Sequence, residues 1–304
     1  MTLRYPLLCL PLLAACAGPP QADAPQACTV QRVAEVPVTL RDGFLTVPAT
    51  IEDKPVTMLI DTGAERTMVT PGTVSALRLD RDRHRRTQII GTGGSTISAN
   101  AKVQSFGFGG YEVSDQSYAV GPLGPDQSEG GLVGADWLSL FDVEIDVPQH
   151  RIALYQEQGC DGRYIPWHGP YTEIQHVRPQ GRALIVLPVQ VAGQPITAIL
   201  DSGANTTQMT ETAASRLGVD EAALARDPSG LTVGVDQTNV TMHQHRFSDM
   251  VVGADEFPHV LLSVGAVQVP GADMLLGADF LRTRRVWLSY ATQQVFIQRS
   301  SPAG

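Results

Sequence analysis

The sequence predicts a mostly β protein made of two related lobes. Short apolar stretches alternate with glycine, proline, asparagine and aspartate, which is the pattern of strands separated by turns. A shift of 140 positions also lays residues 44–80 over residues 184–220 without gaps, and positions such as Pro48, Asp61 and Asp80 then meet identical residues. Expected strands include residues 44–51, 143–147, 183–191 and 286–290.

The repeat continues after a small change of register. A shift of 143 aligns Gly134-Ala135-Asp136 with Gly277-Ala278-Asp279, so a three-residue insertion separates the two shifts. A repeat of this length has the size of a domain and is too long for a solenoid unit. We therefore expect a first lobe over residues 36–155, a linker over 156–181 and a second lobe over 182–304. Short helices are expected at residues 73–79 and 211–217, and after each Gly-Ala-Asp segment.

The N-terminus has the pattern of a targeting segment. Arg4 precedes an apolar stretch that is too short for a permanent membrane span. Leu13-Ala14-Ala15-Cys16 resembles a bacterial lipobox, which implies a signal peptide over residues 1–15 and lipidation of Cys16; a standard signal with cleavage nearby is the alternative. Ala17 resembles the pattern for outer-membrane sorting, and residues 16–35 are expected to form a tether. These features imply a lipid-anchored protein on the periplasmic face of the outer membrane.

Two cysteines remain if Cys9 leaves with the signal and Cys16 takes lipid. Cys28 and Cys160 then form an even pair in an exported protein, which favours a disulfide. Two free thiols are the alternative. The disulfide would join the start of the first lobe to its end.

Two tetrapeptides indicate the chemistry. Asp61-Thr62-Gly63-Ala64 and Asp201-Ser202-Gly203-Ala204 each follow an apolar run at equivalent places in the repeat. An ordinary turn after a strand accounts for one such sequence, because Asp and Gly both favour tight reversals. It does not account for a second copy with matching downstream segments. Two carboxylates held together retain one proton between them, so one acts as a base while the other donates a hydrogen bond.

These residues resemble the retropepsin-like aspartic protease family. The resemblance rests on both tetrapeptides and on the later segments 132–138 and 275–281, and it covers most of the chain. It implies two β-barrel lobes related by a pseudo-twofold axis, with Asp61 and Asp201 as the catalytic pair and no metal or organic cofactor. It also implies that the hydroxyls of Thr62 and Ser202 hydrogen-bond across to the opposite loop.

The neighbouring small residues have their own physical reasons. Gly63 and Gly203 allow backbone to come close to the carboxylates, where a Cβ would be crowded. Ala64 and Ala204 stand where pepsin-type members often have Ser or Thr, whose hydroxyl favours the charged carboxylate. Alanine lacks that hydroxyl, so we expect the carboxylate pKa to be less depressed and the working range to be mildly acidic to neutral.

A substrate-covering flap is expected at residues 88–97, where a glycine-rich tip lies between two strand-like stretches. The tip residues are Gly91, Thr92, Gly93 and Gly94, and glycine supplies the conformations that a tight hairpin needs. A plain hairpin without substrate contact is the alternative. The matching segment, 234–238, has a single glycine, which predicts two unequal flaps.

Composition excludes several other functions. A formal net charge of −9 argues against nucleic acid as a partner. The basic residues at 78–86 alternate with acids and are interpreted as a solvated surface. His243 and His245 alternate along an expected strand, but two histidines alone are weak support for a metal site. No apolar run long enough for a membrane helix follows the N-terminus.

The sequence therefore favours a monomeric, exported, lipid-anchored endopeptidase that acts on proteins or peptides. A peptide-binding module that has lost catalysis is the second hypothesis. A third is an obligate homodimer in which equivalent lobes pair between two chains.

Overall fold

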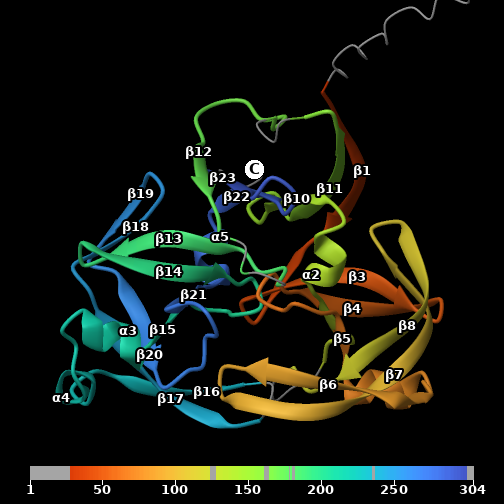
Figure 1. Cartoon of the computed structure of the whole chain (residues 1–304), viewed down its shortest axis with the longest axis horizontal. Coiled ribbons are helices and arrows are strands. Elements are labelled where there is room, and N and C mark those ends of the chain that lie inside the picture. Colours follow the sequence, from red (N-terminus) through yellow and green to blue (C-terminus); the bar gives the residue numbers. More distant parts are fainter. Residues whose placement is uncertain are drawn as a thin grey trace, which may run out of the picture.

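The computed structural model describes residues 28–123, 128–160, 164–177, 179, 182–234 and 237–299. In this part of the chain the strands form three sheets, one in each lobe and one that joins the lobes (Figure 1). Among the described residues, no helix has the length and apolar character needed to cross a membrane. The prediction of a mostly β fold with two β lobes is confirmed.

The first-lobe sheet has the strand order β2-β3-β4-β9-β5-β8-β7-β6. An additional pairing of β3 with β7 bends this sheet back on itself. Its elements are β2 (Thr39–Arg41), β3 (Phe44–Ile51), β4 (Lys54–Ile60), β5 (Met68–Val69), α1 (Pro71–Ala76), β6 (Arg81–Gly91), β7 (Gly94–Phe108), β8 (Tyr111–Val120), β9 (Gly131–Val133) and α2 (Ala135–Leu138).

The second-lobe sheet has the order β16-β17-β20-β15-β21-β14-β13-β18-β19. Its centre repeats the first lobe, because β14 pairs in parallel with β21 as β4 does with β9. The elements are β13 (Val186–Val191), β14 (Gln194–Leu200), β15 (Gln208–Thr210), α3 (Glu211–Arg216), α4 (Glu221–Leu224), β16 (Ser229–Val233), β17 (Asn239–Arg246), β18 (Asp249–Val252), β19 (Asp255–Pro258), β20 (Leu261–Gly265), β21 (Met274–Leu276) and α5 (Ala278–Leu281).

The interlobe sheet lies along the top of Figure 1 and has the order β1-β11-β10-β22-β23-β12. Strand β10 of the first half pairs antiparallel with β22 of the second half, so main-chain hydrogen bonds join the lobes directly. This sheet was not expected from the sequence. Its strands are β1 (Thr29–Pro37), β10 (Asp142–Asp146), β11 (Arg151–Gln158), β12 (Thr172–Gln175), β22 (Arg284–Ser289) and β23 (Gln294–Arg299).

Two expected boundaries are wrong. The tether was expected to extend to residue 35, but β1 starts at Thr29 and pairs with β11. The linker was expected over residues 156–181, but its first residues complete β11 and its later part forms β12. Pairing with the edges of the interlobe sheet orders both segments. The signal peptide and Cys16 lie outside the described residues.

The predictions about the disulfide and the short helices are confirmed. Cys28 and Cys160 form the expected disulfide, which ties the start of β1 to the end of β11. Helices occur at all four expected places, and α4 is an additional one. The hydroxyls of Thr70 and Thr210 cap α1 and α3, which begin one residue later.

Candidate active site

The two aspartates lie at equivalent positions, each directly after a buried central strand. Asp61 follows β4 and its N–H donates to the carbonyl of Val133, at 3.0 Å. Asp201 follows β14 and its N–H donates to the carbonyl of Leu276, at 2.9 Å. Strands β9 and β21 therefore hold the start of each active-site loop.

The loops interlock across the lobe boundary through their hydroxyl residues. The Thr62 hydroxyl donates to the carbonyl of Leu200 at 2.6 Å and accepts the N–H of Ser202 at 3.0 Å. Reciprocally, the Ser202 hydroxyl donates to the carbonyl of Ile60 at 2.7 Å and accepts the N–H of Thr62 at 3.1 Å. Both side chains are fully buried. The two lobes are thus joined at the base of the site by a symmetric set of four hydrogen bonds.

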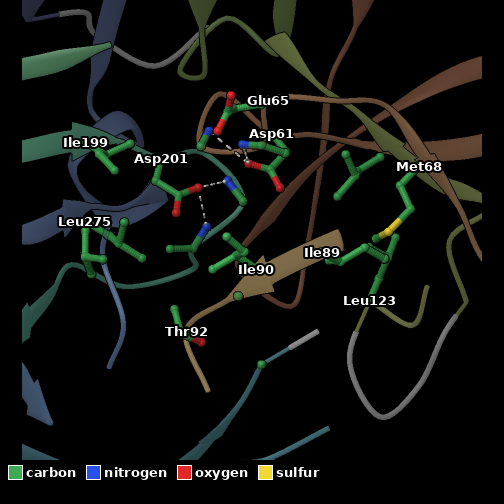
Figure 2. Close-up of a pocket in the computed structure, with 18 of the residues that line it drawn as sticks. Asp61, Glu65, Met68, Ile89, Ile90, Thr92, Leu123, Ile199, Asp201 and Leu275 are labelled. Carbon is green, nitrogen blue, oxygen red and sulfur yellow. Dashed lines mark hydrogen bonds between the residues drawn. The ribbon is translucent and has the colours of Figure 1, made fainter. Parts of the chain in front are cut away.

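The glycines allow the two carboxyl groups to approach each other. A Cβ built on Gly63 would lie 2.4 Å from Cγ of Asp201, and one built on Gly203 would lie 2.4 Å from Cγ of Asp61. Real Cβ atoms do not come so close to another heavy atom, so each glycine makes room for the aspartate of the opposite lobe. Each aspartate is therefore packed against the other lobe's loop (Figure 2).

Hydrogen bonds orient both carboxyl groups. Oδ1 of Asp61 accepts the N–H groups of Gly63 and Ala64, and Oδ1 of Asp201 accepts those of Gly203 and Ala204, at 2.9 to 3.2 Å. All four of these hydrogen bonds go to Oδ1, so the backbone of each loop fixes the same oxygen of its aspartate.

Burial controls the protonation of this pair. It raises the pKa of Asp61 well above its usual range, and the adjacent charge of Asp201 raises this pKa further. Burial also raises the pKa of Asp201, against the hydrogen bonds from Gly203, Asp61 and Ala204, which lower it. Because the two groups interact strongly, the raised pKa belongs to the pair. The pair consequently keeps one proton at pH values where isolated aspartates have lost theirs.

The Gly-Ala-Asp segments support the loops, a role that the sequence analysis did not assign. Asp136 accepts hydrogen bonds from the N–H and the hydroxyl of Thr67, both at 2.8 Å. Asp279 accepts the same two from Thr207, at 2.9 and 2.7 Å. Ala135 and Ala278 are the first residues of α2 and α5, and their N–H groups donate to the carbonyls of Ala64 and Ala204, respectively. In the sequence, the repetition of these segments in both halves was the one indication that they have a role in the site.

The dyad lies at the base of a cleft of about 400 Å³ between the lobes. Apolar side chains cover its walls on both sides of the aspartates, as Figure 2 shows. Glu65 and Arg182 form an ion pair at 2.7 Å that crosses between the lobes. The apolar wall residues include Phe44, Leu59, Met68, Ile89, Leu123 and Leu132 on one side and Leu184, Ile199, Val269 and Leu275 on the other.

The expected flap is a hairpin made of the end of β6 and the start of β7. Gly91 pairs with Gly94, which leaves Thr92 and Gly93 as the turn. Residues 87–92 line the cleft with the aspartates, and the Thr92 carbonyl accepts the N–H of Gln268 from the second lobe at 2.9 Å. In the second lobe, Val233 and Gly234 line the cleft from the β16–β17 hairpin. The first flap therefore reaches across the cleft to the opposite lobe.

Other candidate residues lie away from this site. His245 pairs with Asp227 at 2.6 Å. In the described ranges, no group of three or more His, Cys, Asp and Glu side chains is arranged to hold a metal ion.

Comparison with known protein families matches each lobe separately. The family model described as "Aspartyl protease" matches residues 47–137. The model described as "gag-polyprotein putative aspartyl protease" matches residues 187–283. Each match contains one of the two aspartates. A comparison with curated protein sequences gave no significant match. The chain therefore belongs to the retropepsin-like aspartyl protease family and contains two such domains in tandem.

Proposed function

We propose that this protein is an aspartic endopeptidase in which Asp61 and Asp201 activate water to hydrolyse peptide bonds. The observation that supports this most strongly is the close packing of each carboxyl group against the opposite loop at the base of one cleft. A binding-only cleft has no need of two adjacent carboxyl groups, because placing like charges together is costly.

The shared proton defines the two roles. The ionised carboxylate accepts a proton from water as the water oxygen attacks the scissile carbonyl carbon. The protonated carboxyl donates its hydrogen bond, and then its proton, to the carbonyl oxygen. When the resulting tetrahedral intermediate collapses, the C–N bond breaks and the amine leaves with a proton from the pair. One hydroxyl of the intermediate returns its proton to the pair as the C=O bond of the carboxylic acid product forms. The pair then again holds one proton. A dyad of this kind is a known pattern for aspartic proteases.

The cleft is suited to an extended polypeptide. Strand β6 is the edge of the first-lobe sheet and β16 is the edge of the second-lobe sheet, and both reach the cleft. Edge strands have unpaired backbone N–H and C=O groups, which bind an extended chain by strand addition. The apolar walls favour apolar side chains next to the scissile bond.

A cleavage assay tests this proposal. The purified protein and its Asp201→Asn variant are incubated with a denatured protein mixture from pH 3 to pH 8, and the products are identified by mass spectrometry. We expect the wild type to cleave and the variant to be inactive, with the best activity in the mildly acidic to neutral range. A folded wild type that cleaves nothing would favour the peptide-binding module instead.

The oligomeric state is a separate part of the proposal. Because the interlocked loops come from one chain, we propose a monomer with an intramolecular lobe pair. Sedimentation of the active enzyme tests this, since an obligate homodimer would sediment at twice the mass and lose activity on dilution.

We further propose that the protein is exported and lipid-anchored through Cys16 in a bacterial cell envelope, at the periplasmic face of the outer membrane. The lipobox-like residues Leu13-Ala14-Ala15-Cys16 support this. So does the Cys28–Cys160 disulfide, because such bonds form in oxidising compartments. Labelling with palmitate should mark the wild type but not a Cys16→Ser variant. An unlabelled wild type in the membrane-free fraction would contradict the anchor.

A further inference from the structure

The flap strand β6 carries a run of basic side chains beyond the cleft. All of these side chains are exposed. Within the part of the chain that the structure describes, no arginine of the run forms a salt bridge, although Arg85 interacts electrostatically with Asp82. Arg78 and Asp80 precede the strand and have opposite charges, so they add no net charge to the run. The basic residues are Arg81, Arg83, His84, Arg85 and Arg86. This basic run is unusual in a chain whose formal net charge is −9.

A bulge displays the centre of this run. Asp82 pairs with Asn100, and the next paired residue, Arg86, faces Ala99, so residues 83–85 stand outside the β6–β7 ladder. The one acidic residue in the run turns inward: Asp82 is 8% exposed and accepts hydrogen bonds from the N–H of His84 and the hydroxyl of Ser117. Bulges re-aim side chains next to functional sites. Here the bulge presents positive charge to solvent while its acid is engaged inside the sheet.

The basic run continues directly into the cleft. Thr87 is the first β6 residue that lines the cleft, and it follows Arg86. A strand advances about 3.3 Å per residue, so Arg86 lies roughly 13 Å along β6 from Ile90, which lines the cleft near the aspartates. Among the strands that the structure describes, β6 pairs with β7 alone and forms one edge of its sheet. A polypeptide bound along this edge in the cleft therefore meets the basic run after a few more residues.

We propose that Arg81–Arg86 is an exosite for an acidic segment of the polypeptide substrate, several residues to one side of the scissile bond. This inference rests on the proposed endopeptidase function. The backbone edge supplies strand pairing, and the arginines supply charge complementarity and faster encounter. Polypeptide is favoured over an anionic membrane because the same strand edge enters the cleft, where a membrane has no access.

The test uses a peptide core taken from the best cleavage site in the protein-mixture digest. Two pairs of peptides are made, one pair extended on the N-terminal side of the core and the other on the C-terminal side. Within each pair, one peptide carries four Glu and the other four Gln, placed four to nine residues from the scissile bond. The ratio of kcat/KM for the Glu peptide to that for the Gln peptide is measured at low and high salt. The test variant is Arg83→Glu/Arg85→Glu. The control variant is Lys54→Glu/Arg226→Glu, which makes the same charge change on exposed residues outside the cleft lining.

Each exposed ion pair contributes roughly 1.5- to 5-fold, so four pairs predict a wild-type ratio of at least about fivefold for one of the two extensions. The ratio should fall to about one in the test variant and at high salt, and it should stay near the wild-type value in the control variant. Because each ratio is taken within one enzyme, a loss of overall activity does not affect it. A wild-type ratio near one for both extensions, or an unchanged ratio in the test variant, would overturn the exosite.

Binding separates this inference from the proposed function. Fluorescence anisotropy is measured on the Asp201→Asn protein with and without Arg83→Glu/Arg85→Glu. The labelled peptides need no known cleavage site: each has an apolar core extended on one side by four Glu or by four Gln. Arginine-dependent binding supports the exosite even if the wild type cleaves nothing, in which case only the proposed function fails. Sedimentation with phosphatidylglycerol vesicles provides the other arm. Arginine-dependent vesicle binding without any preference for Glu peptides would overturn the exosite and identify the run as a membrane contact.

Discussion

The interlocked hydroxyls at the base of the site should be a main source of stability between the lobes. In a Thr62→Val variant the side chain keeps its shape but loses the hydroxyl. The N–H of Ser202 and the carbonyl of Leu200 then lose a partner in a place with no solvent access. Each unsatisfied buried group costs about 1–3 kcal/mol, so we expect the free energy of unfolding to fall by about 2–6 kcal/mol.

Two further variants separate the hydroxyl from the rest of the side chain. Thr62→Ser keeps the hydroxyl and removes one methyl group, which costs about 1 kcal/mol in a packed site. Ser202→Ala removes the equivalent hydroxyl of the other lobe, leaving the N–H of Thr62 and the carbonyl of Ile60 without it. Because the four hydrogen bonds are arranged symmetrically, Thr62→Val and Ser202→Ala should cost similar amounts.

Urea unfolding monitored by tryptophan fluorescence measures these differences, and kcat/KM on a cleaved peptide measures their effect on the site. Activity should fall with stability, because the same hydrogen bonds position both aspartates. A Thr62→Val variant within about 0.5 kcal/mol of the wild type would refute the reasoning, since surface substitutions have effects of that size. A larger loss for Thr62→Ser than for Thr62→Val would also refute it.

Three more predictions concern pH and the disulfide. In an Ala64→Thr/Ala204→Thr variant, a hydroxyl next to each carboxylate favours the charged form, so the acid limb of the kcat/KM profile should move to lower pH by about half a unit or more; an unchanged limb contradicts this. The pKa of Asp61 is higher in the folded than in the unfolded state, so the stability that its proton contributes is present below the unfolded-state pKa and is lost as pH rises through the folded-state pKa. Asp61→Asn should therefore be more stable than the wild type at pH 7. Urea titrations should show that this advantage disappears as pH approaches 4. Replacing Cys28 and Cys160 by Ser opens a link across 132 positions and should cost about 2–5 kcal/mol, and reductant should lower the melting temperature of the wild type alone.

Features encoded within a few residues could be predicted from the sequence. Strand-Asp-Thr-Gly is a local pattern, and its second copy indicated that the two aspartates meet. Gly91, Gly93 and Gly94 indicated a hairpin. The helices expected at residues 73–79 and 211–217 correspond to α1 and α3. The contact of Thr92 with Gln268 could not be predicted in this way, because it depends on how far one lobe reaches across the other.

The supporting roles of Asp136 and Asp279 were missed for a different reason. Both residues were recognised as landmarks of the repeat, but their partners, Thr67 and Thr207, lie 69 and 72 positions earlier in the chain. Thr67 was itself one of the identical residues in the repeat. Two conserved positions in a repeat can contact each other, but the repeat alone does not say which pairs do so.

The repeat does carry information about the lobe boundary that strand patterns lack. A residue and its copy face each other wherever the pseudo-twofold axis passes between them. Thr62 and Ser202 differ by the first shift of 140, and they interlock. In the interlobe sheet, Glu144 pairs with Trp287, which differs by the second shift of 143, while Asp142 pairs with Ser289 and Asp146 with Arg285 on either side. The axis therefore runs from the aspartates through the middle of the β10–β22 pair. Had that pair been expected to lie at the boundary, the shift alone would have predicted its register, and hence the sheet that holds the two halves of the site together.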